Sequence, residues 1–202
     1  MKYPAFFNKV PTIRLQDPLS DFLGAFENGE LEISYLDCVK LAGHSCPTVA
    51  GAYLMAKLGL EALYGEMLPQ RGQIHIAMRD EETEGVTGVI GTVVAFIAGA
   101  NGAGGFKGIG GHFPRNNLVS YGIPMEGEVT LTRTDTNTSV TLSYSTAAVP
   151  GNPEMQPLMG KSLQGLASAG ERKQFGKLWQ DRVEKILLDT SLWNKMITLK
   201  KG

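Results

Sequence analysis

The sequence predicts an α+β protein in which a small mixed or antiparallel sheet packs with helices and a helical extension follows at the C-terminus. Two periodicities support this prediction. One segment alternates apolar and polar residues as a half-buried strand does, and several others repeat apolar residues at helical spacing. A chain of 202 residues with 43% hydrophobic and 19% charged side chains is also long enough to bury a full core in one domain.

Three helices are predicted in the first third of the chain. A short helix starts at residues 17–18, an Asp-Pro pair typical of helix starts, and ends near residues 28–29. Residues 35–42 form the second helix. Residues 46–64 give the strongest helix prediction, because Pro47 suits the first helical position and apolar residues recur behind it.

The middle of the chain contains the predicted strands. Residues 73–79 alternate and form a half-buried strand. Acidic residues precede the apolar run 86–100, which favours a buried helix, although its Val and Gly content also fits a strand. Residues 101–111 form a Gly-rich loop, and residues 128–133 and 139–145 form a hairpin.

The last part of the chain is predicted to be helical. Residues 150–157 make a turn-rich linker, and an apolar stripe recurs at helical spacing after Lys161. We therefore expect an α+β domain over 1–150 and a helical extension over 151–202 that packs on the same domain. From residue 161 onward the extension is basic, with nine Lys and Arg against four Asp and Glu. The stripe consists of Phe175, Leu178, Trp179, Val183, Ile186 and Leu187.

Bulk properties argue against several classes of partner. The net charge of −1 does not favour a nucleic-acid binder. The most apolar run is too short and too rich in Gly to span a membrane, and the N-terminus lacks the apolar region of a secretory signal. With only two cysteines, we expect a cytoplasmic protein whose thiols serve metal binding or catalysis rather than a disulfide.

The turn Gly-His-Ser-Cys-Pro at residues 43–47 is the clearest chemical feature. Pro47 at the first helical position makes Cys46 the expected N-cap, where unpaired amides and the helix dipole favour a thiolate. His44 lies on the preceding loop, and imidazole with thiolate is a donor pair that suits zinc. The same residues also fit an inert capping cysteine beside a surface histidine.

The pattern Gly-His-x-Cys-Pro, followed at once by a helix rich in small residues, resembles the FmdE-like family, which is named after a component of formylmethanofuran dehydrogenase. The resemblance covers roughly residues 20–145 and continues more weakly through 86–105 and 117–122 into the hairpin. It implies an α+β protein, often dimeric, with a metal site built from this motif, in which His44 and Cys46 are ligands.

The chain departs from the family at several site positions. Ala42 stands where the family usually has another histidine, and Ala100 stands where it has a cysteine after a Thr-Gly pair. Acidic and amide residues that are common on the second helix are replaced by Thr92 and Ala95. The zinc ribbon attached to some members is absent, so only the His and Cys of the turn carry over.

Few residues could replace the missing ligands. His112 ends the Gly-rich loop near the position of the family's second cysteine, and we expect it to be the third ligand, with an exposed loop histidine as the alternative. His75 is expected to be exposed on the polar face of its strand. Glu82 and Glu84 could supply a carboxylate but also suit a helix start. Cys38 is expected to be a small core residue.

The Gly-rich loop has its own candidate residues. Lys107 and Arg115, together with free backbone amides, could bind a small anionic ligand. The loop matches no phosphate-binding or dinucleotide-binding spacing. Close packing, or a mobile lid over the metal, is therefore the favoured interpretation.

The sequence thus predicts a metal-binding protein in which His44, Cys46 and His112 hold one divalent ion, most simply zinc, with an open position as in catalytic zinc sites. Three alternatives stay open. The protein could be a metal carrier or sensor, or an accessory subunit of a larger metallocofactor or redox complex. It could also be a thiol enzyme with Cys46 as nucleophile and His44 as base. We also expect a homodimer.

Overall fold

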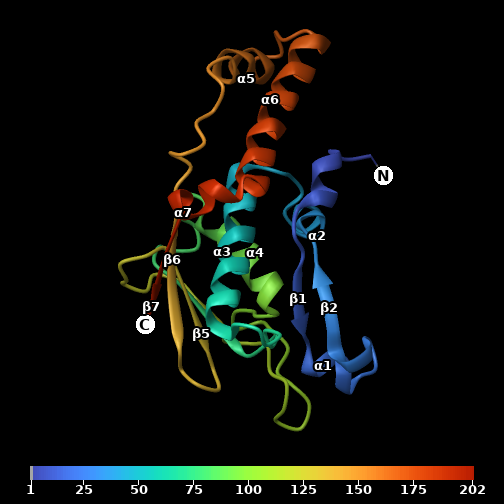
Figure 1. Cartoon of the computed structure of the whole chain (residues 1–202), viewed down its shortest axis with the longest axis vertical. Coiled ribbons are helices and arrows are strands. Elements are labelled where there is room, and N and C mark those ends of the chain that lie inside the picture. The colour runs from blue at the N-terminus through green and yellow to red at the C-terminus, as the bar shows by residue number, and fades with distance from the viewer. Residues whose placement is uncertain (1) are drawn as a thin grey trace.

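The computed structural model describes residues 2–202 and confirms the predicted α+β class (Figure 1). Two central helices lie between a five-stranded sheet on one side and an N-terminal two-stranded hairpin on the other. A pair of C-terminal helices projects from this body, at the top of the view in Figure 1. No helix formed by residues 2–202 is long and apolar enough to cross a membrane.

The five-stranded sheet has the order β4-β3-β5-β6-β7 and is antiparallel except for the parallel pair of β3 and β4. The three central strands were predicted from the sequence: the alternating segment 73–79 forms β3, and the predicted hairpin forms β5 and β6. Buried residues alternate along these strands, as the sequence pattern indicated. The strands are β3 (Ile74–Met78), β4 (Val119–Ser120), β5 (Val129–Arg133), β6 (Ser139–Tyr144) and β7 (Ile197–Lys201).

The central layer consists of α3 (Pro47–Tyr64) and α4 (Thr87–Ala98), which pack against each other. The apolar run before the Gly-rich loop is therefore a helix, and its strand alternative is wrong. On one side α3 contacts β6 and α4 contacts β3. On the other side the Tyr53 hydroxyl of α3 lies 2.8 Å from the carbonyl oxygen of Pro11 and 3.1 Å from that of Ile33, which ties α3 to the N-terminal hairpin.

The N-terminal hairpin consists of β1 (Ile13–Gln16) and β2 (Glu30–Ile33), which sequence reasoning did not predict. The helix expected to end near residues 28–29 is correct at its start and wrong at its end. The helix α1 (Pro18–Phe22) is short, because Gly24 takes a left-handed conformation (φ 67°) and turns the chain back toward β2. The 3-10 helix η1 (Ala5–Lys9) precedes the hairpin, and the 3-10 helix η2 (Glu27–Gly29) lies between its two strands. The helix α2 (Tyr35–Ala42) follows the hairpin, as predicted.

The C-terminal extension is not a single helix. A break around Gly165 (φ 73°) separates α5 (Met155–Leu163) from α6 (Ala169–Leu188). The C-terminal half of α6 packs on α3, and the chain then re-enters the sheet as β7, so the extension is not purely helical. The short elements η3 (Thr190–Leu192) and α7 (Trp193–Met196) connect α6 to β7.

Candidate functional site

The Gly-His-Ser-Cys-Pro turn connects α2 to α3. Gly43 ends α2 in a left-handed conformation (φ 75°), and Cys46 is the N-cap of α3, as predicted. The buried Cys46 Sγ accepts a hydrogen bond from the Val49 N–H at 3.4 Å. The His44 ring is exposed, and its Nδ1 lies 2.9 Å from the carbonyl oxygen of Ala42. The thiol therefore caps a helix inside the protein, while the imidazole lies at the surface.

Ser45, between these two residues, is held by α6. Its carbonyl oxygen accepts hydrogen bonds from Trp179 Nε1 at 2.9 Å and Gln180 Nε2 at 3.2 Å. Its hydroxyl donates to Gln180 Oε1 at 2.9 Å and lies 3.0 Å from the Tyr35 hydroxyl. The turn is consequently the place where α6 docks on the body of the molecule.

His112, the third predicted ligand, lies near the tip of the Gly-rich loop. Its side chain is exposed, and its backbone pairs with that of Ile109. Across residues 2–202, no group of three or more His, Cys, Asp or Glu side chains is arranged to hold a metal ion. The structure therefore does not gather His112, His44 and Cys46 around one point.

The remaining histidine and cysteine, His75 and Cys38, are packed against other parts of the protein. His75 is half-buried rather than exposed, and its Nε2 lies 3.1 Å from the Ser120 hydroxyl on the neighbouring strand. Cys38 is fully buried in the core, as predicted. Burial raises the pKa of the Cys38 thiol to about 12, so that the thiol stays protonated at neutral pH.

A buried ion cluster ties the N-terminal segment to α4 and the Gly-rich loop. The Asp17 carboxylate pairs with Arg71 at 3.0 Å and also accepts from Arg115, whose guanidinium donates to the carbonyl oxygen of Gly99. Arg115 was a candidate for binding an anionic ligand, but it is buried and both of its terminal nitrogens donate inside the protein. Lys107, the other candidate, is exposed on the loop.

Backbone hydrogen bonds close the neck of the Gly-rich loop. The Asn101 N–H donates to the carbonyl oxygen of Arg115, and the Leu118 N–H donates to that of Asn101, each at 2.8 Å. The Asn117 N–H donates to the carbonyl oxygen of Gly102 at 3.0 Å. Because the loop uses these amides itself, the neck is a packed structure and not a row of free anion-binding donors.

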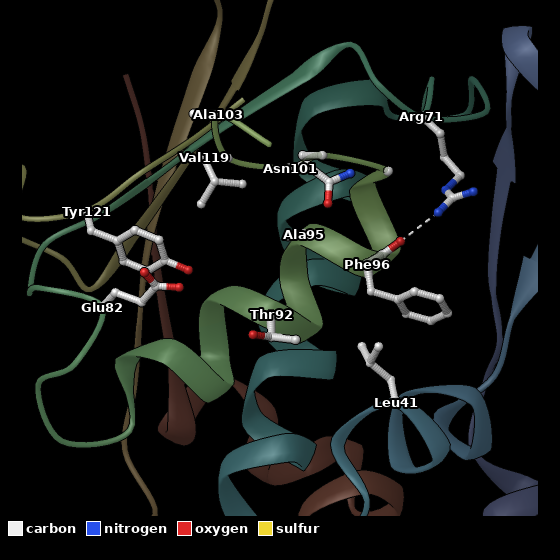
Figure 2. Close-up of a pocket in the computed structure, with 13 residues that line it drawn as sticks. Leu41, Arg71, Glu82, Thr92, Ala95, Phe96, Asn101, Ala103, Val119 and Tyr121 are labelled. Carbon is white, nitrogen blue, oxygen red and sulfur yellow. Dashed lines mark hydrogen bonds between the residues drawn. The ribbon is translucent and has the colours of Figure 1, made fainter. Parts of the chain in front are cut away.

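A pocket of about 570 Å³ lies beside α4, between α2, the neck of the Gly-rich loop and the segment around β4 (Figure 2). Leu41 of α2 and Phe96 of α4 form one end, and Val119 and Tyr121 lie toward the other. Ala95 lines the middle, on the face of α4 that borders the cavity. Apolar side chains therefore form parts of the wall at both ends, and polar side chains lie among them.

Two polar side chains of the pocket already have partners within the protein. Arg71 donates to the carbonyl oxygens of Ile97 at 3.1 Å and Phe96 at 2.7 Å, which satisfies the last turn of α4. The Thr92 hydroxyl donates to the carbonyl oxygen of Gly88 at 2.7 Å. Neither group is free to be the main recognition element for a ligand.

Three other polar side chains line the pocket without such partners. Within the described chain, the side chains of Glu82, Asn101 and Tyr121 take part in no hydrogen bond or salt bridge among those found. Sequence reasoning singled out neither Asn101 nor Tyr121, and the only signal for them is that both lie in segments that carry the family resemblance. These three groups are the free donors and acceptors of the cavity.

Three of the four residues that the sequence analysis set against the FmdE-like pattern line this pocket. They are Thr92, Ala95 and Ala100; the fourth, Ala42, is not part of the lining, but its neighbour Leu41 is. These residues come from α2, from α4 and from the residue pair that follows α4. The sequence analysis named Thr92, Ala95 and Ala100 because the FmdE-like pattern has metal-ligating or polar residues there, and in the structure all three border one cavity.

The sequence matches no protein-family model, and it has no significant match among curated proteins. The resemblance to the FmdE-like family therefore rests on the motif at residues 43–47. Neither comparison supplies a substrate, a cofactor or a partner.

Proposed function

We propose that this chain is a divergent relative of the FmdE-like family that binds a small organic molecule in the pocket beside α4. The observation that carries the proposal is that Thr92, Ala95 and Ala100 line one cavity. These positions were taken from the family resemblance, and all three lie on α4 or just beyond its end, on the side that borders the cavity. His44 and Cys46 do not line this cavity, so the proposed ligand site is distinct from the turn that carries the motif.

The side chains of this pocket do not fit a tightly held transition metal. Such an ion takes imidazole, thiolate or carboxylate donors, commonly three or four of them. Ala95 and Ala100 offer only methyl groups, and Glu82 is the one carboxylate on the lining. A lining that mixes apolar side chains with a few unpaired polar ones, and a volume of about 570 Å³, instead suit a small organic ligand with both polar and apolar parts.

A pocket-filling variant tests this proposal. Ala95→Trp places an indole in the cavity, whereas Ala147→Trp adds the same group at an exposed position away from it. Screening a metabolite library by thermal shift, we expect at least one compound to stabilise the wild type and Ala147→Trp but not Ala95→Trp. Compounds that stabilise both variants equally bind elsewhere, and a library in which every hit behaves so would count against the pocket.

A second candidate function, metal binding at the turn, is favoured by the setting of His44. Its Nδ1 donates to the Ala42 carbonyl oxygen, an arrangement common in metal-ligating histidines, and this leaves Nε2 as an exposed ligand atom. Cys46 lies two residues away at a helix N-terminus. A single divalent ion, most simply zinc, would need further ligands from solvent or a partner. That requirement suits a carrier, a sensor or an accessory component of a larger complex.

A further inference from the structure

We infer that the ligand of the α4 pocket is an amphipathic amine whose ammonium group binds between Glu82 and the ring of Tyr121. This inference rests on the proposed function and names the class of its ligand. The pocket has two different ends: Glu82 and Tyr121 lie at one, and Leu41 and Phe96 lie at the other, with Ala95 between them (Figure 2). An elongated molecule with a charged head and an apolar body matches that arrangement.

Charge distinguishes the two ends. The only charged side chains on the lining are Arg71 and Glu82. The Arg71 donors are used by Asp17 and by two carbonyl oxygens of α4, so they are not available to an anionic group. Glu82 is exposed and takes part in no salt bridge found within residues 2–202. An unpaired carboxylate on the wall of a partly closed cavity favours a cationic ligand.

Helix stabilisation does not explain the acidic segment that carries Glu82. Acidic residues at this place are expected to lie in the first turn of α4, where the helix dipole favours them. The first turn of α4 contains none of them, and its N-cap Val86 makes no side-chain hydrogen bond. Of the four carboxylates in residues 80–84, Asp80 alone has a basic partner within the described chain, Arg79 at 2.9 Å. The segment therefore gives this end of the pocket a negative potential.

Tyr121 adds an aromatic surface beside the carboxylate. Gly91 leaves room for it, because a Cβ at that position would lie 2.5 Å from the Tyr121 hydroxyl oxygen. Burial first, and the charge of nearby Glu82 second, raise the pKa of the Tyr121 phenol, which therefore stays protonated at neutral pH. An aromatic face next to a carboxylate favours ammonium groups, since the cation–π attraction adds to the ion pair.

Three probes with a common phenylethyl body separate charge from shape: 2-phenylethylammonium, 2-phenylethanol and 3-phenylpropanoate. In NMR titrations of the full chain at neutral pH, we expect saturable shifts of the Gly102 and Val119 amides with the ammonium probe and clearly weaker binding of the other two. Glu82→Gln should weaken ammonium binding about fivefold, as for the loss of one partly exposed ion pair. Glu84→Gln removes the same charge from the same segment, away from the pocket lining, and should change it less than about twofold.

The outcomes separate this inference from the proposed function. Equal binding of the alcohol and the ammonium probe, or ammonium binding unchanged by Glu82→Gln, overturns the amine class. If Ala95→Trp abolishes the binding of the probes in either of these cases, the pocket is still a ligand site and the proposed function stands. Ammonium binding that persists in Ala95→Trp lies outside the pocket and overturns the amine inference, and the library screen then decides the proposed function. If no probe shifts the two amides, the amine class fails, and the library screen alone decides the proposed function.

Discussion

Ser45 joins two parts of the chain that are far apart in sequence. Its partners on α6, Trp179 and Gln180, follow it by 134 and 135 residues. The Pro47 signal was sufficient to predict the N-cap role of Cys46, because capping is a local property. No local pattern could reveal that the backbone of the same turn binds a distant helix. The motif therefore has a structural role that sequence reasoning missed.

This role predicts the effect of Ser45→Ala. The change removes the hydroxyl that links Tyr35 and Gln180 and leaves two part-buried polar groups without it. We expect the free energy of unfolding, measured by urea denaturation, to fall by about 1–3 kcal/mol. Ser191→Ala, at an exposed position, is the control and should be nearly neutral. Equal stabilities of the two variants would contradict the docking role of Ser45.

Metal binding at the turn is also a prediction about single residues. If His44 and Cys46 hold an ion, His44→Ala and Cys46→Ser should each abolish zinc retention, whereas Cys38→Ser should not, because Cys38 is fully buried in the core. Elemental analysis of protein purified without chelators, followed by competitive zinc titration, measures this. Metal-free protein that ignores added zinc would rule out the metal candidate.

His112→Ala is the informative comparison within the same titration. We expect it to cost less affinity than His44→Ala, because the structure does not group His112 with the turn. A loss as large as that of His44→Ala would mean that the loop tip reaches the ion, and the ligand set predicted from the sequence would then be correct.

At the scale of elements, the helices and strands with regular apolar periodicity were predicted from the sequence, whereas the short strands were not. The helices α2 and α3 and the strands β3, β5 and β6 lie within about a residue of their predicted bounds, because each shows one clear apolar period. The strands β1, β2 and β7 have four or five residues each, and long-range pairing stabilises them. Such strands have little local signal, and the same holds for the early end of α1.

Two helical glycines should respond in opposite ways to substitution by Ala. A Cβ at Gly51 of α3 would clash with the ring of Tyr144, whereas a Cβ at Gly176 of α6 would meet nothing within 4 Å. By calorimetry we expect Gly51→Ala to destabilise the protein by about 1–3 kcal/mol through overpacking. We expect Gly176→Ala to stabilise it by roughly 0.5–1 kcal/mol through helix propensity. Stabilisation by both would mean that the α3–β6 contact can relax.

At the scale of the whole molecule, the α+β class followed from the mixture of helical and strand periods, but the return of the last residues to the sheet as β7 did not. The apolar stripe of α6 is not buried evenly along the helix. Val183, Ile186 and Leu187 are buried, while Phe175 is only half-buried. Which half of an amphipathic helix meets the core depends on where its neighbours lie, and that is tertiary information.

The prediction of a homodimer came from the family resemblance and from the apolar stripe of α6, and the α5–α6 pair offers a second apolar surface for it. Near its break, Leu163 is 81% exposed and Leu166 is 72% exposed, which a second copy could cover. Light scattering should give about twice the chain mass of 21.8 kDa. The double change Leu163→Glu with Leu166→Glu should give the single mass, while Met67→Glu, at another exposed apolar residue, should not. A wild-type mass of one chain would contradict the prediction.

The hydrogen bond from Trp179 to Ser45 places an indole directly at the turn that carries His44 and Cys46. The chain has one other tryptophan, Trp193, whose indole donates to the carbonyl oxygen of Ile186. With Trp193 replaced by Phe, the tryptophan emission of the protein would come from the single indole of Trp179 beside the turn. The molecule thus contains its own optical reporter, and an ion or a partner arriving at that turn could be followed in solution without any attached dye.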